Sequence, residues 1–320
     1  MKSLKAVSLV ILIFLLFQIS FLNCSQSNTE TTATLELKND ALLGEGALWN
    51  YKTQELYWVD IVGMKFHIYN PKTQTNKSYN MPTMIGTVVP LNDYYCLVAL
   101  ADNIYKLNLD TEELLPFSDV ELTKEENRFN DGKCDPNGNL WAGTINLDNP
   151  KKCKLYKINN EGESEIMIDS ITNSNGIVWS KDAKTMFYID SPSKQIKAYD
   201  FNNATSTISN ERILVEVEDS FGILDGMAID ENDNLWVGLW DGFAVANFNS
   251  KTGELIRKIK VPAKNVTSCA FGGENLDILY ITTSSLGMTE EEQKRYPNAG
   301  SLFKVKPGVK GVNTTHFKLD

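Results

Sequence analysis

A short sequence pattern recurs six times along this chain and restricts the possible folds more strongly than any other feature. In its clearest copy, residues 224–238, a polar residue and a glycine precede an apolar run, a polar turn and a second apolar run. Such a pattern predicts two strands joined as a hairpin. The second run of each copy contains an equivalent anchor residue, at Leu56, Tyr95, Leu140, Met186, Leu235 and Leu279. Successive anchors are 39, 45, 46, 49 and 44 positions apart.

Repeats of this length indicate the architecture. Self-similar β units of about 40 to 50 residues are typical of propeller blades. Six copies therefore predict an all-β, six-bladed β-propeller whose blades surround a central channel. Strand-like segments at 35–43 and 300–305 lie at the two ends of the repeats, and a closed ring often combines both termini in one blade. We expect these two segments to share a blade.

Helical periodicity is scarce outside the N-terminus. One short helix is expected at 289–295, where Thr289 and Glu292 have the spacing of a capping box. The N-terminal residues differ from the rest, because Lys2 and Lys5 precede an apolar stretch of 17 residues, 6–22. That stretch is short for a membrane span, so we interpret residues 1–24 as a signal peptide. A signal anchor retained in the membrane is the alternative.

The mature chain, residues 25–320, contains no linker-like segment and is predicted to form a single propeller domain. Secretion is expected, with no membrane attachment after signal cleavage. Four N-glycosylation sequons agree with this expectation, at Asn76, Asn203, Asn265 and Asn313. Asn76 and Asn203 lie between copies of the pattern, where loops are expected.

Four cysteines remain after removal of the signal peptide. Cys96 and Cys269 fall on predicted strands and are expected to be buried as small apolar residues. Cys134 and Cys153 flank the hairpin around Trp141, and the sequence is compatible with either a disulfide between them or two free thiols.

The charge distribution limits the possible partners. The chain has a net charge of −10, and its charges are scattered rather than clustered. A nucleic-acid interface requires grouped lysines and arginines, so no nucleic acid is expected as a partner. The expected partner is a small molecule, and the oligomeric state is unknown from the sequence.

The polar residue that opens the pattern is Glu45, Asn130, Asn175 or Asp225 in four of the copies, 10 or 11 positions before the anchor. Equivalent positions of a radial repeat lie on one ring, so these side chains should meet at one mouth of the channel. The Asp-Gly and Asn-Gly pairs here are not read as hairpin turns, because the evident turns follow the first apolar run. Arg128 precedes Asn130 by two residues, which places both on one side of a strand.

Carboxylate and carboxamide oxygens suit calcium, magnesium or manganese, and they can hold zinc. Only two histidines occur, His67 and His316, and both lie outside the repeated pattern. This argues against Ser-His-Asp and Cys-His catalysis and favours a metal-assisted reaction in which a carboxylate activates water. The segment 230–234 lacks the glycine and glutamate of a calcium loop, so it is interpreted as a turn.

Several of these segments resemble one protein family, that of regucalcin (senescence marker protein), gluconolactonase and luciferin-regenerating enzyme. The similar segments are 44–46, 128–133, 135–136, 142–144, 174–176, 225–227, 267–273 and 308–311, and the resemblance extends over about 40–312. It implies a six-bladed propeller with one catalytic divalent metal ion. It also implies hydrolysis of a sugar lactone or a related cyclic ester.

The resemblance also implies roles for single residues. Glu45, Asn175 and Asp225 match the metal ligands of the family, and Asp225 also matches its general base. Arg128 and Asn130 match positions that contact substrate. The arginine has a second interpretation, since it would also neutralise the neighbouring carboxylates.

Asp148 aligns with a substrate-binding glutamate of the family, and its shorter side chain would reach less far. This departure keeps open an alternative function, a secreted ligand- or calcium-binding propeller without turnover. A reaction of the luciferin-regenerating type, on a nitrile-derived product, is a third possibility implied by the resemblance alone.

Overall fold

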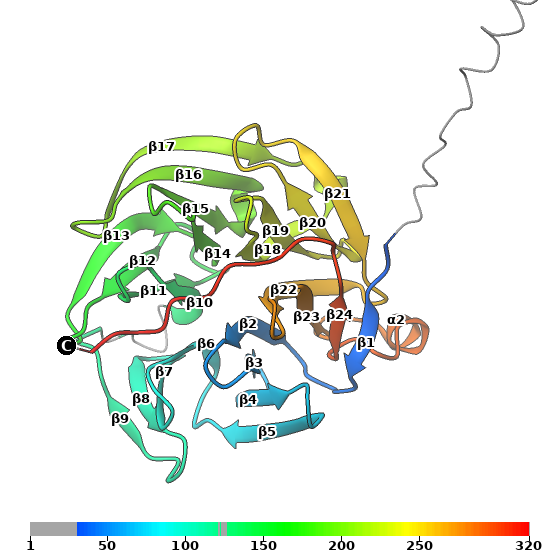
Figure 1. Cartoon of the computed structure of the whole chain (residues 1–320), viewed down its shortest axis with the longest axis horizontal. Helices are drawn as coiled ribbons and strands as arrows, with labels where there is room; N and C mark the ends of the chain where they lie inside the picture. The colour runs from blue at the N-terminus through cyan, green and yellow to red at the C-terminus, as the bar shows by residue number, and fades with distance from the viewer. Residues whose placement is uncertain (1–30, 121, 123–126, 320) are drawn as a thin grey trace, which may run out of the picture. The chain divides into compact units, whose positions relative to one another are not determined.

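Each copy of the repeated pattern forms the two inner strands of a four-stranded antiparallel sheet. The computed structural model describes residues 31–120, 122 and 127–319, so the expected signal peptide lies outside the described residues. Six such sheets surround a central axis (Figure 1). The prediction of an all-β, six-bladed propeller is confirmed, and every anchor residue lies on the second strand of a blade.

The blades are numbered here in chain order, with strands given from the inside outward. The first blade contains β2 (Gly44–Asn50), β3 (Glu55–Asp60), β4 (Lys65–Asn70) and β5 (Thr75–Asn80). The second contains β6 (Ile85–Pro90), β7 (Tyr95–Leu100), β8 (Ile104–Asn108) and β9 (Leu114–Pro116). The third contains β10 (Arg128–Cys134), β11 (Leu140–Ile145), β12 (Cys153–Ile158) and β13 (Ser164–Ile171).

The fourth blade contains β14 (Ser174–Trp179), β15 (Thr185–Asp190), β16 (Gln195–Asn202) and β17 (Thr207–Glu216). The fifth contains β18 (Ile223–Ile229), β19 (Leu235–Trp240), β20 (Ala244–Phe248) and β21 (Leu255–Lys260). The sixth contains β22 (Asn265–Gly272), β23 (Ile278–Ser284), β24 (Leu302–Val305) and β1 (Thr34–Leu37).

The sixth blade closes the ring. Its outer strand, β1, comes from the N-terminal side and pairs with β24, with Leu35 opposite Phe303. The two segments expected to share a blade therefore do so, although β1 is shorter than the predicted segment. The inner strands also join, because the Thr267 hydroxyl in β22 donates to the Gly44 carbonyl in β2 over 2.6 Å. Radial closure of this kind leaves only short, protected sheet edges.

Helices are few among the described residues. The helix α2 (Glu290–Arg295) begins at Thr289, whose side chain and that of Glu292 form the predicted capping box. Two short 3₁₀ helices also occur, η1 (Ser191–Ser193) and η2 (Asp219–Phe221). Within the described part of the chain, no helix has the length and apolar character needed to cross a membrane.

Large aromatic side chains pack where blades meet. Trp141 of the third blade contacts Trp179 of the fourth, with ring centroids 5.7 Å apart. Trp236 and Phe271 make the corresponding contact between the fifth and sixth blades, also at 5.7 Å. Because aromatic rings bury large apolar areas, these contacts hold neighbouring sheets together.

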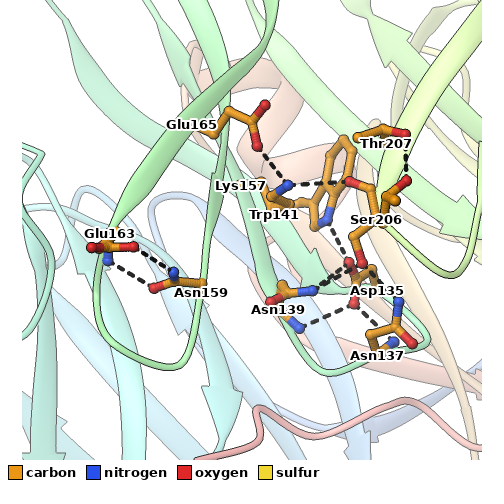
Figure 2. Close-up of polar contacts among 11 residues, drawn as sticks. Asp135, Asn137, Asn139, Trp141, Lys157, Asn159, Glu163, Glu165, Ser206 and Thr207 are labelled. Carbon is orange, nitrogen blue, oxygen red and sulfur yellow. Dashed lines mark hydrogen bonds and ion pairs between the residues drawn. The ribbon is translucent and has the colours of Figure 1, made fainter.

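Two of these tryptophans are anchored by an aspartate in the preceding turn. The Asp135 carboxylate accepts bonds from its own turn, at Asn137 N (2.9 Å) and Asn139 N (3.0 Å), and from Trp141 Nε1 (3.0 Å) (Figure 2). The Asp230 carboxylate accepts the same bonds in the fifth blade, including one from Trp236 Nε1 at 3.0 Å. Its oxygens are thus occupied within the turn, which agrees with the interpretation of 230–234 as a turn.

All four described cysteines are buried and free. The burial expected for Cys96 and Cys269 is confirmed. Cys134 ends β10 opposite Leu140, whereas Cys153 begins β12 at the other end of the same blade. The blade register therefore keeps the two thiols apart, and the open question of a disulfide between them is answered in the negative.

The sequons differ in accessibility. Asn203 and Asn313 are exposed, whereas Asn265 is buried in β22. The expectation of a loop at Asn76 was wrong, because this residue lies in β5. Its side chain accepts a bond from Trp58 Nε1 (3.2 Å) and donates one to His67 Nδ1 (3.1 Å).

The segment after β24 crosses the mouth of the channel where the hairpin turns lie (Figure 1). It binds turns of several blades, through Glu231 N to Lys310 O (2.8 Å), Phe317 N to Pro90 O (2.9 Å) and Lys318 N to Gly138 O (3.1 Å). Below it lies a cavity of about 280 Å³ lined by residues of the inner strands and by residues 312–315. The opposite mouth is the one at which the inner strands begin.

Candidate active site

Every inner strand is irregular close to the mouth at which it begins. In β2 the pairing with β3 shifts register between Glu45 and Leu48, and corresponding shifts occur in the other five inner strands. Bulges of this kind bend a strand and change the direction of its side chains. The polar residues of the repeated pattern lie at or beside these irregularities.

The structure brings the four residues of the predicted ring together at this mouth. Glu45, Asn130, Asn175 and Asp225 are 6%, 7%, 3% and 6% exposed. The carboxyl groups of Glu45 and Asp225 are within hydrogen-bonding distance of each other. On the neighbouring blades, Asn130 Nδ2 donates to Asn175 Oδ1 over 3.3 Å.

Gly176 and Gly226, which follow Asn175 and Asp225, serve close packing rather than turns. A Cβ atom at Gly176 would lie 2.6 Å from Met227 Cβ and 2.7 Å from the Asp225 carbonyl oxygen. A Cβ atom at Gly226 would lie 2.5 Å from the Ser268 hydroxyl oxygen. Only glycine allows inner strands of adjacent blades to approach this closely.

The carboxyl pair lies in a poorly solvated and acidic environment. Burial, followed by the charge of Asp131, raises the pKa of Glu45 to about 8. Burial likewise raises the pKa of Asp225 well above its ordinary value, and the charge of Glu45 adds to the effect. A cation at this position would relieve both the desolvation and the repulsion between the two carboxylates.

Asn175 is held with its amide oxygen toward the ring. Its Nδ2 atom donates to the Ser191 hydroxyl over 2.8 Å, and that hydroxyl donates to the Leu224 carbonyl over 2.7 Å. The Ser191 oxygen therefore acts as the acceptor for Asn175, which fixes the orientation of the amide. Oδ1 is left to face Asn130 and the ring.

Arg128 and Asn130 form a continuous hydrogen-bonded chain. Arg128 Nη1 donates to the Phe129 carbonyl and to Asn130 Oδ1, both over 2.9 Å. Asn130 Nδ2 then donates to Ser174 O (2.8 Å) and Asn173 Oδ1 (3.1 Å) of the next blade. Burial lowers the pKa of Arg128 to about 10, and the charge of Glu45 opposes this, so the guanidinium is charged at neutral pH.

Asp148 is not part of this buried group. It lies in the loop between β11 and β12, where it is exposed and its backbone N–H donates to Asn146 Oδ1 over 3.1 Å. Because Ile145 at the end of β11 pairs with Arg128, this loop is at the same mouth as the ring. Asp148 and the buried residues could therefore contact the same ligand only if that ligand extended from the ring to the exposed loop.

Sequence reasoning missed other polar groups at this mouth. Asp131 is 5% exposed, and its Oδ2 atom has no hydrogen-bond partner among the described residues. Burial raises the pKa of Asp131, and the charge of Lys133 opposes the rise. Asp131 directly follows Asn130 in the bulge, where simple strand alternation does not predict the direction of a side chain. Asn173 precedes Asn175 by two residues, which is the only sequence feature that could have indicated it. No sequence feature indicated Ser191.

The donor set fits a divalent metal ion. Two buried carboxylates and an oriented amide oxygen are hard ligands of the kind that calcium, magnesium and manganese prefer. The partnerless Asp131 oxygen adds a further buried negative atom. Among the described residues, no three His, Cys, Asp or Glu side chains are arranged as a metal site, so the candidate set depends on the carboxamide of Asn175.

Comparisons with known proteins identify the family of the chain. The model of the family described as "SMP-30/Gluconolactonase/LRE-like region" matches residues 43–285. A protein of Bacillus subtilis named "Putative sugar lactone lactonase YvrE" is 36% identical over 289 residues, which cover 90% of this chain and 99% of that protein. Regucalcin of Xenopus laevis is 34% identical over 282 residues, which cover 86% of this chain and 94% of regucalcin.

A solved structure shows the same fold. The structure of a luciferin-regenerating enzyme superposes with a TM-score of 0.80 at 32% sequence identity. The superposition covers 90% of this chain and 100% of that enzyme.

Proposed function

The chain belongs to the SMP-30/gluconolactonase/LRE-like family, and from this premise we propose that it is a metal-dependent hydrolase of a lactone or related cyclic ester. The observation that carries the proposal is the buried pair of Glu45 and Asp225 beside the charged guanidinium of Arg128. A pair of carboxyl groups kept out of water is costly unless a cation or a shared proton compensates it. A catalytic site offers a reason to retain such a pair.

Glu45, Asn175 and Asp225 would hold the ion through carboxylate and carboxamide oxygens. Calcium, zinc, magnesium and manganese all remain candidates. A bound divalent ion would polarise the lactone carbonyl as a Lewis acid.

Asp225 is proposed as the general base. Its carboxylate would take a proton from the water molecule that attacks the carbonyl carbon. As the new C–O bond forms, the ring C–O bond breaks, and the same proton passes to the departing ring oxygen. The product is the open-chain hydroxy acid.

Arg128 and Asn130 are proposed to bind the substrate. The chain of bonds from Arg128 through Asn130 to the fourth blade holds both side chains in place before substrate arrives. A guanidinium offers several donors in a planar fork, which suits an ester or hydroxyl group. Asp148 would reach the substrate only from the rim.

The first experiment measures metal content and turnover together. The purified protein should contain one divalent ion by elemental analysis, and a chelator should abolish hydrolysis across a panel of lactones. Asp225→Asn preserves size but removes the charge, so metal content should fall and turnover should be lost. A variant with full metal content and full lactonase activity would show that the ring assignment is wrong.

The second experiment separates substrate binding by Arg128 from charge balance. Arg128→Lys should reduce kcat/KM by about 10- to 100-fold, because a charged hydrogen bond contributes about 1.5 to 3 kcal/mol. The melting temperature and metal content should change little. A large fall in melting temperature with unchanged turnover would instead assign Arg128 a structural role. Metal binding without turnover of any lactone would favour the alternative, a ligand- or calcium-binding propeller.

A further inference from the structure

The inner strands carry a second set of mouth positions, one or two residues ahead of the ring. We call this set the upper ring. Its members are the first residues of the six inner strands or the residues directly before them, namely Gly44, Met84, Arg128, Asn173, Ile223 and Asn265.

Contacts show which way the upper ring faces. Arg128 Nη1 reaches Asn130 Oδ1 (2.9 Å), and Asn173 Oδ1 receives a bond from Asn130 Nδ2 (3.1 Å). The side chains of Arg128 and Asn173 therefore lie directly beside the candidate catalytic residues. Ile223 begins β18 two residues before Asp225 and pairs with Trp240, so it lies at the same mouth as the ring, while Leu224 beside it is fully buried.

The upper ring carries polar side chains on the third, fourth and sixth blades and apolar side chains on the second and fifth. Arg128 and Asn173, on the third and fourth blades, form a polar pair. Met84 on the second blade and Ile223 on the fifth flank this pair, and they are 36% and 48% exposed. Neither side chain offers a hydrogen bond to a substrate hydroxyl apart from the weak thioether acceptor of Met84.

Exposed apolar residues are also distributed unevenly between the two ends of the channel. Single exposed apolar side chains are common on proteins and need no explanation. Here, however, the loops and strand ends at the catalytic mouth contribute a whole set, namely Leu42, Met64, Met84, Leu147, Ile223 and Leu286. The described segments at the other end contribute three, Tyr94, Leu255 and Leu319.

We propose that the substrate is a lactone or cyclic ester with an apolar substituent rather than a polyhydroxylated sugar lactone. This inference rests on the proposed function. The ester group would bind at Arg128 and Asn130, and an alkyl or aryl substituent would cover Ile223 or Met84. A polyol lactone would have to bring hydroxyl groups against these apolar side chains and lose bonds to water without replacement.

The test compares two δ-lactones that differ in substituents, glucono-1,5-lactone and δ-decalactone. The metal-loaded protein should hydrolyse δ-decalactone with the higher kcat/KM. In Ile223→Asn, kcat/KM for δ-decalactone should fall about tenfold through KM, since a few methylene contacts are worth that much. The value for gluconolactone should stay constant or rise.

Ile213→Asn provides a matched control. Ile213 is 56% exposed on β17, the outer strand of the fourth blade, far from the channel in the strand order. Ile213→Asn makes the same chemical change, and it should leave kcat/KM unchanged for both substrates. Met84→Gln repeats the test from the other side of the polar pair, and melting temperatures confirm that each variant is folded.

The outcomes distinguish this inference from the proposed function. Preference for gluconolactone, or equal effects of Ile223→Asn and Ile213→Asn, would overturn the inference and leave lactone hydrolysis standing. Absence of turnover on both lactones would overturn the proposed function. The apolar contact would then be tested by binding of the matching alkyl δ-lactam, which should be weaker in Ile223→Asn than in the unsubstituted protein. A further outcome concerns membranes. If the unsubstituted protein sediments with phosphatidylcholine vesicles and Ile223→Asn does not, while turnover is unchanged, the rim is assigned to a membrane surface and the inference is overturned.

Discussion

Asp135→Ala should destabilise the propeller while the catalytic mouth stays intact. Asp135 is fully buried in the hairpin turn at the opposite end of the channel, and its carboxylate links that turn to Trp141 (Figure 2). Removing the carboxylate leaves Trp141 Nε1 and the backbone N–H groups of Asn137 and Asn139 without their acceptor. Asn139 Nδ2 retains its bond to Ser206 Oγ at 3.0 Å.

The expected loss follows from these bonds. A buried donor left unsatisfied costs about 1 to 3 kcal/mol. Trp141 Nε1 should carry the full cost because the side chain has no exposed surface, whereas water can reach the partly exposed residues of the turn. We expect a decrease of about 3 kcal/mol in the free energy of unfolding. Asp135→Asn should lower the free energy of unfolding by less than Asp135→Ala, because the amide Oδ1 still accepts bonds from the turn. Some loss should remain, because the amide Nδ2 is a donor and cannot replace the second acceptor oxygen.

Urea denaturation followed by tryptophan fluorescence measures this quantity. Asp230→Ala in the fifth blade is the matched comparison, because Asp230 accepts the same set of bonds, and it should cost a similar amount. Lactone turnover per folded molecule should be unchanged in both variants. A loss below about 1 kcal/mol, or a fall in kcat/KM beyond the fraction unfolded, would refute the reasoning.

Three further predictions concern packing, pH and processing. Gly176→Ala would place a Cβ atom 2.6 Å from Met227 Cβ, so the free energy of unfolding should drop by about 1 to 3 kcal/mol in urea titrations; an unchanged midpoint would contradict the close approach. Burial lowers the pKa of His67 from 6.5 to about 4, so stability present above pH 6.5 should be lost toward pH 4 by about 3 kcal/mol, and His67→Gln should flatten that slope. If the protein is secreted from a glycosylating host, mass spectrometry should find glycan on exposed Asn203 and none on buried Asn265, with an N-terminus near residue 25; an intact Met1 without glycan would contradict secretion.

The sequence alone determined the features that depend on local periodicity. Alternating apolar residues specify strands, and their regular recurrence specifies the number of blades, so the anchors from Leu56 to Leu279 predicted the second strand of every blade. The helix after Thr289 was also predictable, because a capping box involves residues only three positions apart. The ring of Glu45, Asn130, Asn175 and Asp225 followed from the repeat, because equivalent positions in a closed ring must meet.

Only the tertiary structure decided what depends on bulges and on contacts between blades. The register shift in β10 between Phe129 and Gly132 contains Asp131, so strand alternation does not predict the direction of its side chain. The bond between Asn130 and Asn173 joins residues of different blades, and the register of the third blade keeps Cys134 away from Cys153. Likewise, the side-chain bonds of Asn76 to Trp58 and His67 form only after β3, β4 and β5 have paired. Local propensity carries no information about distances between strands that are far apart in sequence, and those distances set the electrostatics of the site.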